Sequence, residues 1–408
     1  MPALVKARRR ALHLGHGSGE KADLNALRHW LIEKALPVWA THGFDVGTQR
    51  FQERLDKAAR PIAVPQRAMV QARQIYVYAQ AAMLGWHPEG AALAESAMAA
   101  LRRDYLEMSN GRASVVFSVH PASGAPVSRV RDAYTHAFVL FALAQLHAMN
   151  GDAELLTLAD MIIAYVDEEL TDAVHGGVFD ASPRTGAKRQ NPHMHLLEAY
   201  LALDTAAPGR GYIERAHRLV QLFHDRLAHL EHEIVLEHFA DDWGNHPDKA
   251  MLFEPGHHYE WAWLLHRHQK LGGADHAAWR ERLHRTATEF GRSDNGLLWD
   301  EVGADRRVLK RSTRLWPHTE AIKAASVRHT DGDAEAAAFA QHMSDLLFAH
   351  FLDLPFEGGW TDHLASDLAP LVDYVPASSL YHLMHAASEA EIAFPRRVQE
   401  DASPLIHV

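Results

Sequence analysis

The sequence contains 408 residues, carries a formal net charge of −11 and has a pI near 6.3. Proteins whose main partner is a nucleic acid or an anionic membrane need a basic face, so this charge argues against both and favours a small-molecule substrate. The absence of cysteine excludes disulfides, thiolate catalysis and cysteine-bound zinc, and it fits a cytoplasmic location. No apolar run approaches the length of a transmembrane helix.

Residues 1–22 are expected to form a mobile N-terminal tail. They contain a basic run from Lys6 to Arg10 but lack an apolar core suited to a signal peptide. Residues 23–408 are expected to form one domain, because no Pro/Ser-rich linker divides them. Two stacked all-helical domains are the alternative. The oligomeric state is left open between a monomer and a homodimer.

Helical hydrophobic patterns follow one another almost without interruption from Asp23 onward. Helices that are apolar on most of their surface, such as residues 64–84, alternate with more amphipathic ones, such as residues 91–106. The expected helices cover residues 23–40, 64–84, 91–106, 131–149, 153–170, 192–204, 212–230, 255–271, 277–290, 317–327, 334–351 and 376–392.

Gly- and Asp-rich segments with short strand character lie between the outer and inner helices. Corresponding points in these segments fall about 60 residues apart, which indicates a helix-pair repeat, and they lie near Val116, Val178, Val235, Leu297 and Gly359. The pattern predicts an all-α fold, an (α/α)6 barrel of six helix hairpins with short β-hairpin loops on the active-site face. The loops at the N-terminal ends of the inner helices would then form the pocket.

His257 and Glu260 lie three residues apart at the start of a helix opened by Pro255 and Gly256, so helical spacing places both on one face. A buried histidine satisfied by a carboxylate is the structural interpretation. In the functional interpretation, Glu260 holds His257 in the charge state that acid–base chemistry needs.

Similar groups occur at two other Pro-containing helix starts. His195 and Glu198 repeat the three-residue spacing, with Asn191 at the cap position. Glu320 follows Trp316, and an indole beside a carboxylate suits the apolar face and the hydroxyls of a sugar. First-turn placement near the helix dipole is the structural alternative for Glu320.

Further candidates lie on helices that are otherwise apolar. Arg73 needs a charged or hydroxylated partner if its helix is buried. Tyr134 and His136 occupy a similar helix start, and His382 is a second possible proton carrier. A core histidine is the alternative interpretation of His382.

Other histidines were assigned less functional weight. His193 is expected to face solvent, and His266, His268 and His276 are expected to be solvated because they lie among Arg, Lys and Gln residues. Combinations such as His257 and His258 with Glu260, or His193 with His195, would suit zinc or manganese. Without an HExxH motif or a dense carboxylate cluster, no metal is expected. Phosphorylated substrates are disfavoured because no Lys/Arg cluster or glycine nest is evident near the motifs.

Five ordered motifs resemble those of the N-acylglucosamine 2-epimerase superfamily, over residues 23–392. The motifs are QARQIYVYA (71–79), NPHMHLLEAYLAL (191–203), EPGHHYEWAWLL (254–265), RLWPHTEAIKA (314–324) and PASSLYHLMH (376–385). The forms RLWPHTE and PASSLYH are most similar to the aldose–ketose isomerase branch, the bacterial D-mannose isomerases.

The resemblance implies an (α/α)6 barrel and histidine-based proton transfer at C1 and C2 of an aldose, with no metal or other cofactor. It assigns His257 and His382 as the acid–base pair, with Glu260 orienting and polarising. Binding of substrate hydroxyls or help with ring opening falls to Arg73, Asn191, His195 and Glu320, with Tyr134 and His136 as looser matches.

The expected activity is therefore interconversion of D-mannose and D-fructose, and possibly of D-lyxose and D-xylulose, through a cis-enediol. A sugar 2-epimerase that uses the same two histidines is the main alternative, because the two outcomes differ only in where the proton returns. Glu260 and Glu320 could also serve as the carboxylate pair of an inverting glycoside hydrolase. A non-catalytic sugar-binding protein is the remaining alternative.

Overall fold

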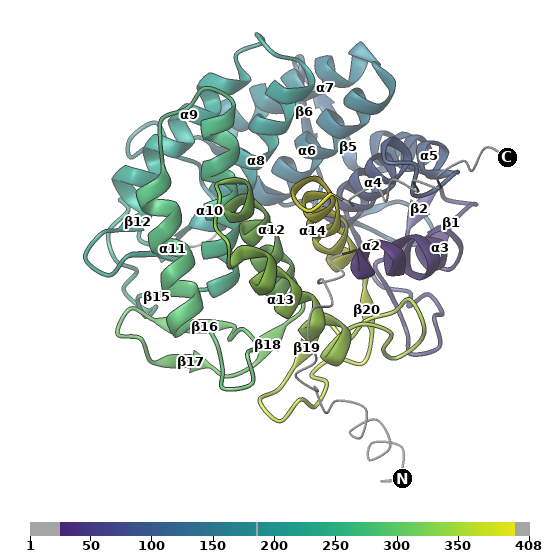
Figure 1. The fold of residues 1–408 in the computed structure, drawn as a ribbon. Coiled ribbons are helices and arrows are strands. Elements are labelled where there is room, and N and C mark those ends of the chain that lie inside the picture. The colour runs from purple at the N-terminus through teal and green to yellow at the C-terminus, as the bar shows by residue number, and fades with distance from the viewer. Residues whose placement is uncertain (1–24, 185–186, 396–408) are drawn as a thin grey trace, which may run out of the picture.

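The computed structural model describes residues 25–184 and 187–395. Six helices in this part of the chain form a closed inner ring, in which each helix packs against the next and the last packs against the first (Figure 1). The ring consists of α4 (Ala68–Met83), α6 (Ala133–Asn150), α8 (Gln190–Ala206), α10 (Pro255–Lys270), α12 (Trp316–Thr330) and α14 (Leu380–Ala393).

An outer layer of amphipathic helices covers this ring. In α9, for example, the buried residues Tyr212, Ala216, Leu219 and Val220 recur at helical spacing. The arrangement is an (α/α)6 barrel, as predicted. The outer layer consists of α2 (Ala26–Trp30) continued by η1 (Leu31–Ala35) and α3 (Leu36–Thr41), α5 (Gly90–Tyr105), α7 (Ala153–Tyr165) with η2 (Val166–Leu170), α9 (Tyr212–Leu222) with η3 (Phe223–Leu227), α11 (Ala277–Phe290) and α13 (Ala336–His350).

Short strands join the loops at one end of the barrel into a second ring. Each strand that leads into an inner helix pairs in antiparallel fashion with a strand of the following loop, and the last such strand pairs with the first loop. The pairs are β4 (Gln66–Arg67) with β7 (Ser118–Val119), β9 (Arg131–Asp132) with β10 (Ala181–Ser182), β11 (Lys188–Arg189) with β14 (His238–Phe239), β15 (Leu252–Phe253) with β16 (Glu301–Gly303), β18 (Thr313–Arg314) with β19 (His363–Leu364), and β20 (Val375–Pro376) with β3 (Arg54–Leu55).

Further strands extend or precede this ring. β8 (Pro126–Ser128) pairs with β7, and β17 (Val308–Lys310) pairs with β16. Three hairpins follow outer helices. They are β1 (Phe44–Asp45) with β2 (Arg50–Phe51), β5 (Leu106–Ser109) with β6 (Arg112–Val115), and β12 (Ala228–His229) with β13 (Ile234–Val235).

Strand formation explains three helix boundaries that were predicted wrongly. The helix expected to begin at residue 64 begins at Ala68, because residues 66–67 form β4. The last inner helix begins at Leu380, after β20 and the 3₁₀ turn η4 (Ala377–Ser379). The helix expected to reach residue 230 ends at Leu227, where β12 begins.

A histidine at the start of four inner helices ties the helix to the preceding hairpin or turn. Nε2 of each histidine accepts a backbone N–H at 2.8 to 3.1 Å. In the first inner helix, Gln71 does the same with the N–H of Phe51. The histidines are His136, His193, His258 and His318, and the donors are Val115, Val178, Val235 and Leu298, in the same order.

These anchors correct two predictions. His136 was assigned to substrate, but Nδ1 and Nε2 of its buried ring both bond to the backbone, with Nδ1 on the carbonyl of Asp132. His193 was expected to face solvent, yet it is fully buried and bonds in the same way to Val178 and Arg189. Sequence cannot separate such a histidine from a catalytic one, because both occur in the first turn of an inner helix.

The prediction that three histidines near the end of α10 and the start of α11 are solvated is also wrong. His266, His268 and His276 are each at least nine-tenths buried. His268 lies within a chain of ring-to-ring hydrogen bonds, 2.6 Å from His217 and 2.9 Å from His276. Their Arg and Lys neighbours in sequence occupy other faces of the helix, which is why local composition misled.

None of the helices within the described residues is long and apolar enough to cross a membrane. The N-terminal tail predicted for residues 1–22 lies outside the described residues, as do residues 23–24, 185–186 and 396–408 of the predicted domain.

The histidine anchors predict a loss of stability in mild acid. Burial lowers the pKa of His136, His193 and His318 to about 4 and that of His258 to about 3. Histidines in the unfolded chain have pKa values of about 6.5, so the unfolded chain binds more protons than the folded one between this pH and about 4. The free energy of unfolding therefore falls as the pH drops through this range. Urea unfolding at several pH values measures this slope.

A His193→Gln variant provides the matched control, because Gln71 shows that an amide can accept the same backbone N–H. The variant carries one titrating anchor fewer, so its slope in this window should be shallower by about 1.4 kcal/mol per pH unit. An unchanged slope would contradict the assignment of His193 as a neutral anchor.

Candidate active site

A cavity of about 380 Å³ opens among the N-terminal turns of the inner helices. Its walls combine aromatic rings with arginine, histidine and glutamate side chains, a composition suited to a hydroxylated ligand. Its lining residues are Arg67, Met69, Arg73, Tyr134, Asn191, His195, Glu254, His257, Glu260, Arg314, Trp316, Asp362, Ser378, Ser379 and His382.

Most of the residues predicted for the site line this cavity. Two do not: His136 is the backbone anchor described above, and Glu320 lies behind the wall, fully buried beside His382. The predicted residues that line the cavity are Arg73, Tyr134, Asn191, His195, His257, Glu260, Trp316 and His382.

His257 is held by Glu237, a residue that the sequence analysis missed. Nδ1 of His257 lies 2.9 Å from Oε1 of Glu237, and the Glu237 carboxylate also accepts hydrogen bonds from the Gln190 side chain and the Glu254 backbone. Burial alone would lower the pKa of His257, but the charges of Glu237 and Glu254 raise it to about 10. His257 is therefore an imidazolium at neutral pH.

The charge of His257 determines the orientation of Asn191. The amide of Asn191 lies 3.2 Å from Nε2 of His257, while Oδ1 of the same amide has no partner among the described residues. Amide oxygen and nitrogen are assigned from their hydrogen bonds, and a protonated Nε2 donates. The structure has Nδ2 of Asn191 facing Nε2 of His257, so an imidazolium at His257 would require the oxygen and nitrogen of this amide to exchange places.

Glu260 does not bond to His257 as predicted. Its carboxylate lies 3.9 Å from Nδ1 of His195, and Oε1 has no hydrogen-bond partner within the described residues. Burial raises the pKa of Glu260 well above its ordinary value, and the nearby charges of Glu320 and Glu198 raise it further. Its surroundings therefore favour the protonated form of Glu260, which can donate a hydrogen bond to a ligand oxygen.

His382 is held in the opposite charge state from His257. Its Nδ1 lies 2.8 Å from Oε1 of Glu320, and Oε2 of Glu320 forms an ion pair with Lys323 at 2.7 Å. Burial, with the charges of Arg73 and Lys323, lowers the pKa of His382 well below its ordinary value. Because Nδ1–H donates to Glu320, Nε2 is left as the unprotonated, basic nitrogen.

Trp316 connects the two histidines. Its ring packs against His257 at 4.9 Å and against His382 at 5.6 Å between centroids. These contacts limit rotation of both imidazoles, so the basic and the acidic ring keep a fixed spacing. The position of Trp316 in the first turn of α12 places it in the cavity wall.

Arg73 provides the cavity with a fixed positive charge. Its guanidinium packs on Phe138 at 4.1 Å and on Tyr381 at 4.9 Å, donates to the Tyr134 hydroxyl at 2.7 Å and donates to the Ser378 carbonyl at 3.2 Å. None of these partners is a carboxylate. Arg73 is thus available to stabilise a negative charge that develops on a ligand.

A buried polar network lies below the cavity. Glu198 bonds to Nδ1 of His195 at 3.0 Å and accepts from the Tyr381 hydroxyl. The positive charge of Lys323, whose pKa the surrounding glutamates raise despite its burial, helps to balance the carboxylates. The sequence signal for Glu198 and Lys323 is that each is a charged residue on a helix that is otherwise apolar.

Two sets of donors in the site could in principle hold a metal ion. They are His195, Glu198 and Glu260, and Glu237, Glu254 and His257, and within each set the donor atoms lie within 4.8 Å of one another. Both sets contain a histidine–glutamate hydrogen bond, which a cation would have to replace.

The chain is similar to known sugar-converting enzymes. It is 30% identical over 381 residues to mannose-6-phosphate isomerase of Rhizobium meliloti (strain 1021), covering 91% of this chain and 97% of that protein. It is also 30% identical over 279 residues to D-mannose isomerase of Thermobifida fusca, covering 62% of this chain and 67% of the relative. The fold matches cellobiose 2-epimerase from Bacillus thermoamylovorans B4167 with a TM-score of 0.81 at 18% identity, covering 90% and 98% of the two chains.

The family model described as N-acylglucosamine 2-epimerase (GlcNAc 2-epimerase) matches residues 50–386, which include every residue placed in the cavity above. The chain therefore belongs to the N-acylglucosamine 2-epimerase family and is an enzyme of the sugar isomerase and epimerase class.

Proposed function

We propose that this enzyme is a metal-independent aldose–ketose isomerase that interconverts D-mannose and D-fructose, and also acts on D-lyxose and D-xylulose. One observation carries the proposal: two histidines that line the same cavity are held in opposite charge states. The charges of Glu237 and Glu254 favour protonation of His257, whereas burial and the charges of Arg73 and Lys323 disfavour protonation of His382. A pair of groups with pKa values pushed apart provides a base and an acid at the same pH.

His382 is the base in this mechanism. After the pyranose opens, Nε2 of His382 removes the proton from C2, which the adjacent C1 carbonyl makes acidic. His257 donates to the carbonyl oxygen, and Arg73 stabilises the charge of the resulting cis-enediolate. His382 then returns its proton to C1, while His257 gives a proton to O1 and takes the proton of the C2 hydroxyl, which restores the imidazolium and completes the conversion of aldose to ketose.

The same site allows an epimerase as the second candidate. If a proton reaches C2 from the opposite face, donated by His257, the product is the 2-epimer of the aldose. The fixed positions of His257 and His382 against Trp316 support either outcome. The relation to D-mannose isomerase of Thermobifida fusca favours the ketose product.

The remaining site residues are assigned to substrate binding or ring opening. Glu260, as a neutral acid, donates to a sugar oxygen, and His195 beside it is suited to relay a proton during ring opening. Asn191 orients His257, and Tyr134 orients Arg73. Glu320 acts through His382 and touches no substrate.

The position of Glu320 weighs against the hydrolase alternative. An inverting glycosidase needs two carboxyl groups that both reach the scissile bond. Glu320 is fully buried, is bonded to His382 and Lys323, and does not line the cavity that contains Glu260.

The decisive measurement is proton NMR of the EDTA-treated enzyme with D-mannose in D₂O. Formation of D-fructose with deuterium at C1 is expected, and a His382→Asn variant should lose roughly 10²-fold or more of this rate, the usual contribution of a general base. The exposed His42→Asn variant serves as the control. Formation of D-glucose with deuterium at C2 would instead identify an epimerase, and loss of activity with EDTA would refute metal independence.

A second prediction concerns Glu237. The Glu237→Gln variant removes the charge that keeps His257 protonated, so the pKa of His257 should fall from about 10 toward its ordinary value. Because His257 acts as an acid, activity is present below this pKa and is lost above it. The alkaline limb of the pH–rate profile should therefore move to lower pH. The profile of Asp241→Asn, which changes an exposed carboxylate of the same loop, should match the wild type.

A third prediction addresses phosphorylated sugars, which the name of the Rhizobium meliloti relative brings into question. Contrary to the sequence analysis, two further arginines line the cavity, but each has a carboxylate nearby. Arg67 is paired with Glu53, and Arg314 lies 4.0 Å from Asp300. We therefore expect kcat/KM to be higher for D-mannose than for D-mannose 6-phosphate. The reverse order would show that the arginines bind the phosphate group.

A further inference from the structure

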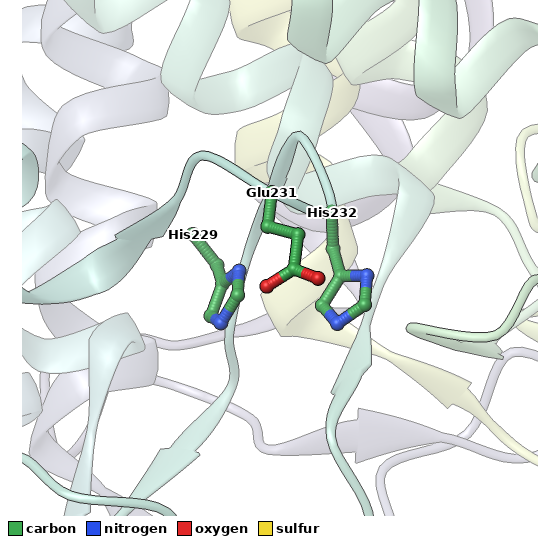
Figure 2. Close-up of side chains that lie close together, drawn as sticks. All are labelled: His229, Glu231 and His232. Atoms are coloured by element: carbon green, nitrogen blue, oxygen red, sulfur yellow. The ribbon is translucent and has the colours of Figure 1, made fainter.

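A cluster of potential metal ligands lies on the β12–β13 hairpin, outside the cavity described above. His229 ends β12, and Glu231 and His232 belong to the turn that leads to β13. Figure 2 shows the side chain of Glu231 close to the two imidazole rings. One donor atom from each residue can be chosen such that all three lie within 4.8 Å of one another.

The interactions that fix the backbone of this hairpin do not involve the side chains of His229, Glu231 and His232. His229 pairs with Ile234 across the strands, and Glu233 closes the turn with a positive φ of 49°. Glu233 also forms ion pairs with Arg282 at 3.3 Å and Arg285 at 2.5 Å. The turn is thus tied to α11 by Glu233 and not by the side chains of the cluster.

The two imidazoles stack against each other. The rings of His229 and His232 lie 4.7 Å apart between centroids, with an interplanar angle of 25°. Nδ1 of His229 is shielded from solvent and has no hydrogen-bond partner among the described residues. A buried ring nitrogen without a partner is costly, and a cation is one group that satisfies it.

We propose that His229, Glu231 and His232 form a binding site for a divalent transition-metal ion of the Zn²⁺ type. Two imidazoles and one carboxylate suit Zn²⁺, whereas Mg²⁺ and Ca²⁺ prefer sites made of oxygen alone. Glu231 is exposed and the histidines are half-buried, so water has access to complete a tetrahedral shell. The site is separate from the active-site cavity and takes no part in the proton transfers proposed above.

Bound metal would act on the segment that follows the hairpin. The N–H of Val235 in β13 donates to His258, and Glu237, two residues further along, holds His257. A cation that joins the end of β12 to the turn restrains the start of this segment. Metal binding should therefore stabilise the folded protein without being required for turnover.

Isothermal titration of the chelator-treated protein with Zn²⁺ tests the proposal. The wild type should bind one equivalent of Zn²⁺ at micromolar concentration. The His232→Ala and His229→Ala variants should either lose this binding or bind Zn²⁺ at least about tenfold more weakly. The control is His246→Ala, which removes a surface-loop histidine that lies near His238 and outside the cluster. This control should bind as the wild type does.

Thermal unfolding with and without Zn²⁺ gives a second readout. The wild type and His246→Ala should gain melting temperature on addition of Zn²⁺, whereas His232→Ala should not. Identical isotherms for the wild type and both cluster variants, or no micromolar binding by the wild type, would overturn the proposal. Sugar turnover should be unchanged in His232→Ala, so failure of the metal site and failure of the proposed isomerase activity are separate results.

Discussion

The barrel depends on how each inner helix is joined to the segment before it. A two-residue strand leads into the helix, and in five of the six inner helices a side chain near the helix start accepts a backbone N–H from the preceding hairpin or turn. Since unsatisfied backbone groups are costly inside a protein, these bonds fix the height and rotation of each helix. The candidates on these five helices, such as His257, lie within a turn or two of the anchors, so their positions follow from the same bonds.

The cavity illustrates how similar residues acquire different properties from their surroundings. Glu237 and Glu320 each accept a hydrogen bond from one histidine. At His257 the main nearby charges are those of glutamates, which favour its protonation. His382 lies near Arg73 and Lys323, which disfavour its protonation. The difference between acid and base therefore depends on the whole lining, and no single histidine–glutamate pair determines it.

Hydrophobic periodicity predicted the helices and the barrel. An inner helix is buried on all sides and an outer helix on one side, and each kind of burial produces its own spacing of apolar residues in the sequence. The helix boundaries near residues 66, 228 and 376 were not predictable in this way, since strands of two residues are too short to show alternation. Residues of all five motifs line the cavity.

Individual roles were harder to assign. Glu237 lies in a loop, and only the fold brings it to His257. Sequence spacing therefore indicates Glu260 as the carboxylate that orients His257. His136 and His193 have the same residue type and helical position as functional groups, but their ring nitrogens bond to the backbone. Such distinctions depend on tertiary hydrogen bonds, which a single sequence does not reveal.

The pairing of β20 with β3 has a consequence for how the enzyme matures during synthesis. This contact joins the last loop before α14 to the first loop of the barrel, and α14 carries His382. A nascent chain that still lacks α14 has an open ring, an incomplete cavity and no basic imidazole opposite His257. In the proposed mechanism, closure of the barrel and the appearance of catalytic competence are thus one event. A chain that ends before this helix would then be inactive, even if its earlier helix pairs had folded.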